Sequence, residues 1–131
     1  MFTKSFIHFS DLHREGIYKI TNEALISAFE SDLLKYKSLN PSINIPSGLV
    51  VTGDIIYGVP FGDKNYNSSL EKQYDEAFNF LRLFVKKFFN GDKTKVIILP
   101  GNHDVNWNKI KNSFEIIRDH KKNFFTKIKE I

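Results

Sequence analysis

The pattern of apolar and polar residues along the chain predicts three repetitions of strand, loop and helix. The first apolar run, residues 2–9, is a candidate strand whose two faces would both be largely covered. A helix is expected to follow from Thr21, because a threonine hydroxyl can cap the first turn. Its apolar residues at helical spacing are Leu25, Ala28, Phe29, Leu33 and Tyr36.

The second repetition begins with a short β-branched run at residues 49–51 and a Gly-Asp pair. Residues 57–67, rich in Gly, Asn and Asp, predict a long surface loop. Ser68 and Glu71 match a capping box that would open the second helix, and Asn90-Gly91 would end it. The apolar stripe predicted for this helix is Leu70, Tyr74, Ala77, Phe78, Leu81, Val85 and Phe88.

The third repetition starts with residues 96–99, an apolar run typical of a strand buried on both faces. A helix from Trp107 would keep its apolar stripe (Ile110, Phe114, Ile117, Phe124 and Ile128) to the last residue, so it either docks on this domain or leads into further sequence. The alternation predicts an α/β fold, β-α-β-α-β-α, with mostly parallel buried strands and right-handed crossovers.

Composition narrows the class of protein. The chain has 131 residues, 41% of them hydrophobic, and no cysteine, so it predicts one domain with a core and excludes a disulfide scaffold or a disordered tail. Every apolar run is short and interrupted by charge, and the first residues lack the features of a secretory signal. We therefore expect a cytoplasmic protein that does not contact a membrane.

The net charge of +4 lies at one end of the chain. Residues 1–104 carry 12 basic and 12 acidic side chains, whereas residues 105–131 carry 7 basic and 3 acidic ones. A lysine-rich helix face is most simply solvated. The alternative is that this basic segment binds nucleic acid, in which case binding would depend strongly on salt.

Polar residues follow each predicted strand: Asp11 and His13, then Asp54, then Asn102, His103 and Asp104. Ligands of parallel sheets bind outside the carboxyl ends of the strands, so these side chains are expected to converge. Asp11 and His13 are two residues apart and, in extended backbone, would point to the same side. Gly53 would allow a tight turn before Asp54, and Asn102 would tolerate left-handed backbone after the turn at Gly101.

This combination of donors suits a divalent ion such as Mn, Fe or Zn, and the absence of thiolates argues against a structural zinc site. A carboxylate can bridge two metal ions about 3.5–4 Å apart, an arrangement that activates water for phosphoester hydrolysis. His103 could then protonate the leaving oxygen. Asp104 also precedes a predicted helix start, where a capping carboxylate is common.

Three ordered segments, HFSDLH at 8–13, VVTGD at 50–54 and VIILPGNHD at 96–104, resemble the motifs of the calcineurin-like metallophosphoesterase family. The resemblance implies that Asp11 and His13 hold the first of two divalent metal ions and that Asp54 bridges both. It implies further that Asn102 binds the second ion and substrate, and that His103, oriented by Asp104, acts on the substrate phosphate. A phosphodiester, nucleotide or nucleic acid is the expected substrate.

The family pattern continues with a further histidine and a Gly-His-x-His motif that these residues do not contain. We therefore expect residues 1–131 to be a single, partial metallophosphoesterase domain, resembling half of the family's four-layer αββα sandwich. Further C-terminal sequence or a second copy would complete the site. The alternatives are a non-catalytic module that binds phosphate or metal, and an accessory domain of a larger protein that acts on nucleic acid.

Overall fold

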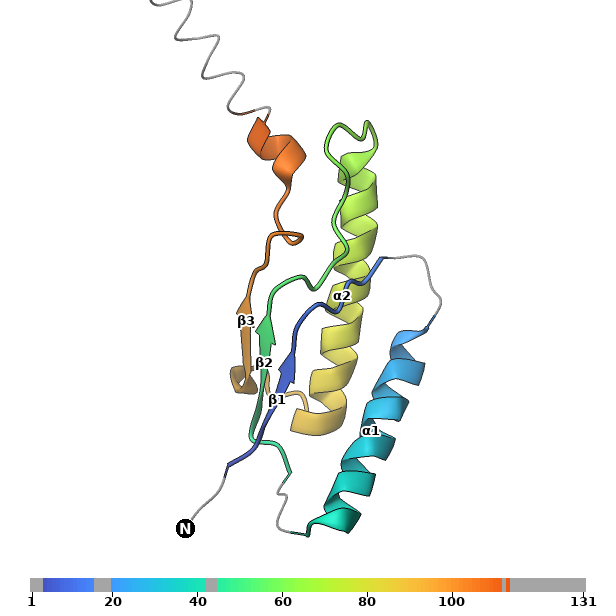
Figure 1. The fold of residues 1–131 in the computed structure, drawn as a ribbon, viewed down its shortest axis with the longest axis vertical. Coiled ribbons are helices and arrows are strands. Elements are labelled where there is room, and N and C mark those ends of the chain that lie inside the picture. The colour runs from blue at the N-terminus through green and yellow to red at the C-terminus, as the bar shows by residue number, and fades with distance from the viewer. Residues whose placement is uncertain (1–3, 16–19, 42–44, 112, 114–131) are drawn as a thin grey trace, which may run out of the picture.

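The computed structural model describes residues 4–15, 20–41, 45–111 and 113 (Figure 1). One sheet holds three parallel strands side by side in chain order: β1 (Phe6–Phe9), β2 (Gly48–Thr52) and β3 (Val96–Leu99). The parallel pairing confirms the α/β fold predicted from the alternation of elements. All three carboxyl ends consequently meet at one edge of the sheet.

Two helices make the crossovers between the strands. The connections are α1 (Asn22–Leu39) from β1 to β2, and α2 (Tyr66–Phe89) with the 3-10 helix η1 (Lys93–Lys95) from β2 to β3. Both helices lie on the same side of the sheet (Figure 1). Residues 107–111 begin a further helix, and most of the third helix predicted from the sequence lies outside the described residues.

The core lies between α2 and the first two strands. Phe84 is fully buried and packs its ring against Phe9, with ring centroids 5.0 Å apart, while Leu49 and Val51 of β2 are buried beside it. A chain this short can bury one such core, and these apolar contacts hold the sheet and helices in a fixed relation. Within the described residues, no helix combines the length and the apolarity needed to cross a bilayer.

Among the residues that the structure describes, the strands are covered on one face only, which corrects the prediction of burial on both. Ile7 and Leu49 face the helices and are buried, whereas Phe6 on the opposite face is 60% exposed and Ile97 is 57% exposed. A continuous apolar run indicates that a strand can be buried on both faces. It does not indicate which element covers each face. The sheet thus has an open apolar face among the described residues.

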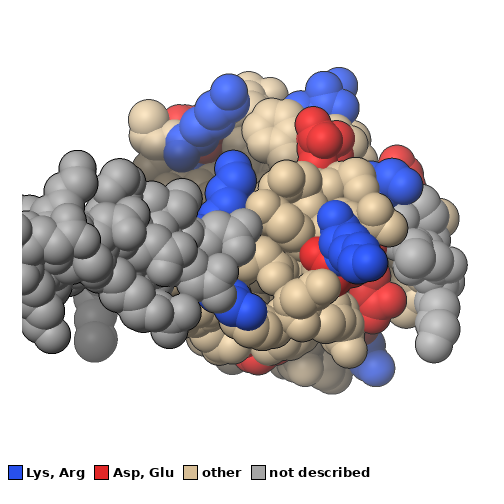
Figure 2. All heavy atoms as spheres, turned by 90° about the horizontal axis from the view of Figure 1, so that it is seen from above, with Lys and Arg blue, Asp and Glu red and all other residues tan. Residues whose placement is uncertain are grey.

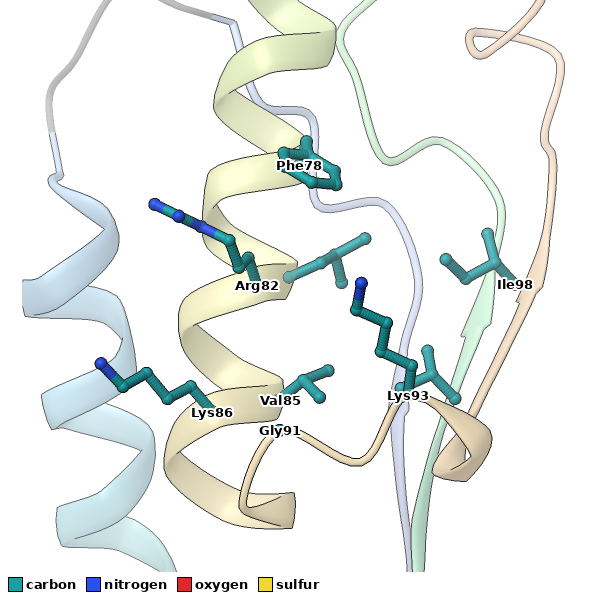
Figure 3. Close-up of a pocket in the computed structure, with 9 residues that line it drawn as sticks. Phe78, Arg82, Val85, Lys86, Gly91, Lys93 and Ile98 are labelled. Carbon is teal, nitrogen blue, oxygen red and sulfur yellow. The ribbon is translucent and has the colours of Figure 1, made fainter.

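The edge strand β3 is also only partly covered on the helix side. Phe78 of α2 and Ile98 of β3 face an apolar groove of about 460 Å³, and Lys93 lies at its lower end (Figure 3). The side chain of Ile98 is 48% exposed. The predicted burial of residues 96–99 is therefore wrong on this face as well, because α2 packs mainly over β1 and β2.

The predicted start of α1 is confirmed, since the Thr21 hydroxyl accepts a hydrogen bond from the Ala24 amide at 3.1 Å. The predicted stripe is only partly right. Ile26 is buried although the stripe omitted it, and Tyr36, which it included, is 60% exposed. Spacing alone gives a helical period, but the angle at which the helix lies on the sheet selects the buried face.

The capping box predicted at Ser68 is wrong. Helix α2 already begins at Tyr66, its N-cap is Asn65, and the Ser68 hydroxyl donates to the Asn65 carbonyl from within the first turn. The predicted end is confirmed, because Asn90 adopts left-handed backbone and its amide donates to the Val85 carbonyl. The motif thus indicated that a helix lies here, but the helix begins earlier in the chain than the motif predicted.

The buried face of α2 also differs from the predicted stripe. Phe80 and Phe89 are buried although the stripe omitted them, while Phe78 is 64% exposed and Tyr74 is 41% exposed. The helix carries apolar residues around much of its circumference, so several stripes fit the helical period. Contact with the sheet decides among them.

Candidate metal centre

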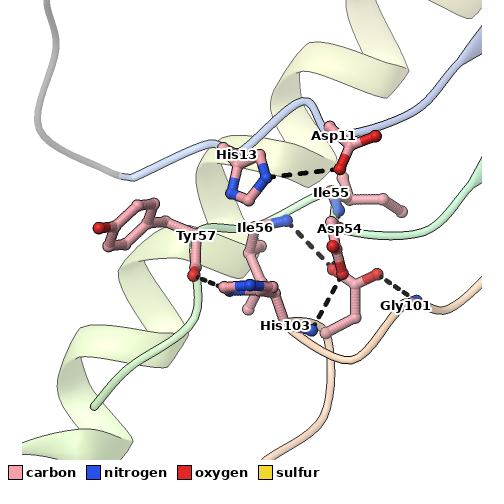
Figure 4. Close-up of polar contacts among 9 residues, drawn as sticks. Asp11, His13, Asp54, Ile55, Ile56, Tyr57, Gly101 and His103 are labelled. Atoms are coloured by element: carbon pink, nitrogen blue, oxygen red, sulfur yellow. Dashed lines mark hydrogen bonds and ion pairs between the residues drawn. The ribbon is translucent and has the colours of Figure 1, made fainter.

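The carboxyl ends of β1 and β2 bring together the first three predicted ligands. Asp11, His13 and Asp54 each offer one ligand atom, and these atoms all lie within 4.8 Å of one another (Figure 4). Asp11 is exposed, whereas the other two are partly buried. The expectation that residues from separate stretches converge is therefore met for these three.

The backbone at these three residues is left-handed, which corrects the extended backbone predicted for Asp11 and His13. Asp11, His13 and Asp54 have φ of 54°, 45° and 51°. Such a conformation costs a non-glycine residue about 1–2 kcal/mol and persists only where other contacts enforce it. Asn102, for which left-handed backbone was predicted, is not among the described residues with positive φ.

Hydrogen bonds between the two strand ends enforce this conformation. The amide of Asp11 donates to the Gly53 carbonyl at 3.3 Å, and the amide of His13 donates to the Asp54 carbonyl at 3.0 Å. The pairing continues one residue further, where the Arg14 amide donates to the Ile55 carbonyl at 2.8 Å. The turns that carry the candidate ligands are thus held by the backbone of the neighbouring turn.

Two glycines allow the turns after β2 and β3 to touch. A Cβ placed on Gly101 would lie 2.2 Å from Asp54 Oδ1, and one placed on Gly53 would lie 2.8 Å from the Gly101 Cα. Gly53 also has a φ of 81°, which confirms the predicted tight turn. The Gly-Asp and Pro-Gly-Asn-His turns therefore form one backbone-to-backbone contact.

His103 joins the centre through both its backbone and its ring. Its amide donates to Asp54 Oδ1 at 3.0 Å, and its ring Nδ1 is hydrogen-bonded to the Tyr57 carbonyl (Figure 4). A carbonyl only accepts, so Nδ1 carries the hydrogen and Nε2 is the nitrogen available for chemistry. The ring centroid lies 5.1 Å from that of His13.

Asp104 does not orient His103 as the resemblance implied. Its Oδ1 accepts from the amides of Ile55 at 2.9 Å and Ile56 at 3.1 Å, and its Oδ2 accepts from the Gly101 amide at 2.8 Å. It is also not the cap of the next helix, where Asn106 Oδ1 accepts from the Lys109 amide. The ring of His103 is held by Tyr57 instead, a role that no side-chain pattern could reveal because it belongs to a carbonyl.

Asn102 lies in the same turn as His103. Its carbonyl accepts from the indole nitrogen of Trp107 at 2.8 Å, and its side chain is exposed. This bond anchors the turn to the helix that starts at residue 107. The assignment of the Asn102 amide as a ligand for metal or substrate stays a prediction.

A buried ion pair joins Arg14, the residue directly after His13, to Glu76 of α2. This pair was not predicted from the sequence. Arg14 Nη2 lies 2.6 Å from Glu76 Oε1, with side chains only 11% and 6% exposed. The same guanidinium donates to the Ile20 carbonyl and lies over the Phe80 ring. The sequence signals were an arginine directly after His13 and a glutamate directly before Ala77, one of the apolar positions predicted for the second helix.

The donor set fits a divalent transition ion. Two carboxylates and an imidazole are the ligands that Mn, Fe and Zn accept, and His13 Nδ1 is buried with no hydrogen-bond partner among the described residues. Such an orphan nitrogen is unfavourable unless an ion or a water meets it. The residues present can therefore hold at least part of a metal shell.

Charged side chains of both signs are interspersed over the surface seen from above (Figure 2). Most of the basic C-terminal segment lies outside the described residues. The described residues on this face thus add nothing in favour of a nucleic-acid site, and that interpretation stays a prediction.

Comparison with known proteins gives one match. A family model described as calcineurin-like phosphoesterase matches residues 4–130. No curated protein and no solved structure matches the chain. The matched range includes every residue of the candidate centre.

Proposed function

The chain belongs to the calcineurin-like phosphoesterase family, and we propose that it serves the metal-dependent hydrolysis of a phosphodiester, nucleotide or nucleic acid. The observation that carries this proposal is the convergence of Asp11, His13 and Asp54 within 4.8 Å. These three side chains come from two strand ends more than 40 residues apart in the sequence. Their left-handed backbone is the kind of strain that folded proteins keep at functional sites.

Asp11, His13 and Asp54 would hold divalent ions, with Asn102 as a further ligand. Two such ions, Mn, Fe or Zn, would supply Lewis acidity toward the phosphate and lower the pKa of a water molecule. Asp54 is the residue best placed to serve two ions, because it stands between the Asp11–His13 turn and the turn of His103. Its Oδ1 already accepts from the His103 amide, which fixes the carboxylate in place.

His103 would act on the leaving group. Because the Tyr57 carbonyl holds the hydrogen of Nδ1, a second proton on this ring must sit on Nε2. A protonated ring would therefore present an Nε2–H donor, able to stabilise developing charge and to protonate the departing oxygen. The remaining ligands that the family resemblance implies would come from further C-terminal sequence or from a second copy.

Calorimetry of the chain with Mn²⁺, and hydrolysis of bis(p-nitrophenyl) phosphate by the protein that carries the remaining ligands, test this proposal. We expect Asp54→Asn to weaken Mn²⁺ binding by at least about tenfold, because it removes an anionic ligand. We expect His103→Ala to retain most Mn²⁺ affinity and to lower turnover by about 10²–10⁴.

Asp63→Asn is the matched control, since Asp63 lies in the loop before α2 and accepts only from the Asn65 amide among the described contacts. It should leave both measurements unchanged. Near-normal turnover by both site variants would refute the proposal. Mn²⁺ binding without turnover, even when the remaining ligands are supplied, would favour the alternative of a binding module.

A further inference from the structure

Asp104 holds together the two turns that carry the chemistry. We propose that it is a positioning residue: its carboxylate fixes Asp54 and His103 relative to each other and thereby sets the metal affinity, without itself contacting metal or substrate. The inference rests on the proposed function. It assigns to Asp104 a role different from that of an orienting partner of the His103 ring.

The first support is the set of amides that the carboxylate binds. Ile55 and Ile56 follow Asp54 in the turn after β2, and Gly101 precedes Asn102 in the turn after β3. One oxygen of Asp104 takes the two amides of the first turn, and the other oxygen takes the amide of the second. A single side chain thus joins two segments that are 45 or more residues apart.

The second support is that both candidate functional residues are covalent neighbours of this junction. Asp54 immediately precedes Ile55, and His103 immediately precedes Asp104. The His103 amide returns a bond to Asp54 Oδ1, so the two turns are linked in both directions. Asp54 is left-handed and strained, and amides held on its C-terminal side keep it from relaxing.

The third support is that the junction is anchored to the scaffold. The Tyr74 hydroxyl of α2 donates to the Asp104 carbonyl at 2.9 Å. Partial burial, and secondarily the charge of Asp104, raise the pKa of the Tyr74 phenol, which favours its neutral, donating form. Rigid elements position functional groups better than free loops do, and this bond extends the rigidity of α2 to the turn.

The arrangement requires a carboxylate and not merely a side chain of the same shape. Asp104 accepts at both oxygens, whereas asparagine would present an NH₂ group at one of them. The NH₂ group would face either the amide N–H of Gly101 or those of Ile55 and Ile56. Two hydrogen-bond donors would then point toward each other in a partly buried site. Asp104→Asn therefore breaks one half of the junction with minimal change in volume.

The decisive experiment measures Mn²⁺ affinity of the chain by calorimetry for Asp104→Asn against Asp92→Asn. Asp92 is the matched control, because its carboxylate also accepts from a backbone amide, that of Thr94, but at the opposite end of β3. We expect Asp104→Asn to weaken binding about 10–100-fold, the usual effect of losing a residue that supports a ligand. Asp92→Asn should leave it unchanged.

Nitrogen-15 chemical shifts of the His103 ring separate positioning from ring orientation. In Asp104→Asn the ring should keep its hydrogen on Nδ1, because the Tyr57 carbonyl holds it there. A change of tautomer would show that Asp104 orients the ring and would overturn the proposal. An Mn²⁺ affinity equal to that of the unaltered chain would overturn it too.

Amide hydrogen exchange provides a readout that needs no metal. The amides of Ile55, Ile56 and Gly101 should be protected in the unaltered chain, and at least one turn should lose protection in Asp104→Asn. If the unaltered chain binds no Mn²⁺, the proposed function fails while exchange still tests the junction. If Asp104→Asn does not fold, unprotected amides in the unaltered chain refute the junction and protected ones support it.

Discussion

The two ends of the sheet use the same polar contacts under opposite conditions of solvent exposure. At the carboxyl end, Arg14 pairs with Glu76 below the surface and Asp104 binds partly buried amides. Toward the other end, Lys87 pairs with Glu30 at 2.8 Å with side chains 48% and 40% exposed, and Asp92 binds an exposed amide. The groups and distances are similar, and only their surroundings differ.

This difference determines what each contact contributes. Exposed pairs are screened by water and contribute little, whereas a buried charge that loses its partner is left without solvation. The polar contacts at the carboxyl end therefore act as fixed parts of the fold. The exposed contacts at the other end should change the free energy of unfolding only slightly. Variants at matched positions of the two ends measure this difference.

The greatest loss of stability should come from the buried pair. Arg14→Met should lower the free energy of unfolding by about 3–5 kcal/mol, because it leaves the Glu76 carboxylate buried without its guanidinium. The double variant Arg14→Met/Glu76→Leu should recover much of this loss, since neither charge of the pair then remains. Urea unfolding of the single and double variants gives the coupling energy.

The same cycle on Lys87 and Glu30 is the matched control. These exposed side chains should couple by about 0–1 kcal/mol. A coupling as large as that of the buried pair would remove the contrast between the two ends. A coupling energy near zero between Arg14 and Glu76 would also contradict the difference between the two ends.

The second prediction compares alanine substitutions at two glycines, of which only one would produce a steric clash. Gly101→Ala should cost about 3 kcal/mol and abolish detectable Mn²⁺ binding, because its Cβ would lie 2.2 Å from Asp54 Oδ1. Gly91→Ala, at the other end of β3, meets nothing within 4 Å and should cost only the left-handed backbone, about 1–2 kcal/mol. Thermal unfolding and calorimetry measure both, and unchanged Mn²⁺ binding in Gly101→Ala would contradict the packed turns.

The smallest effect is a pH dependence at Asp92. The hydrogen bond from the Thr94 side chain, followed by that from the Thr94 amide, lowers the pKa of the Asp92 carboxyl. A lowered pKa stabilises the fold at pH values above the pKa of the unfolded carboxyl, and this contribution is lost as the pH falls through the folded value.

Thr94→Val removes the side-chain bond, so the pKa of Asp92 should rise toward its ordinary value, as an NMR titration would record. Ser38→Ala, which deletes another exposed hydroxyl bond, that to the Lys35 carbonyl, should leave the Asp92 pKa unchanged. An unaltered Asp92 pKa in Thr94→Val would show that the hydroxyl contributes nothing.

Much of the fold could be predicted because its signals are local. The Thr21 cap, the end of α2 at Asn90 and the alternation of strands and helices all depend on residues within a few positions of one another. The convergence of Asp11, His13 and Asp54 followed from one general property, that parallel strands end at a common edge. Boundaries and buried faces were less accurate, as the start of α2 and the exposure of Phe78 show.

Hydrophobic period, caps and turns are encoded locally, and they are enough to predict which elements form, their order and which residues stand at the strand ends. Three features depend on tertiary contacts instead: Asp104 binds three amides, the Tyr57 carbonyl holds His103, and the outer face of β3 stays open among the described residues. Each of these outcomes depends on segments distant in the sequence. The identity of a side chain does not predict which backbone group it will bind, because the partner is defined only when packing brings the two within hydrogen-bond distance.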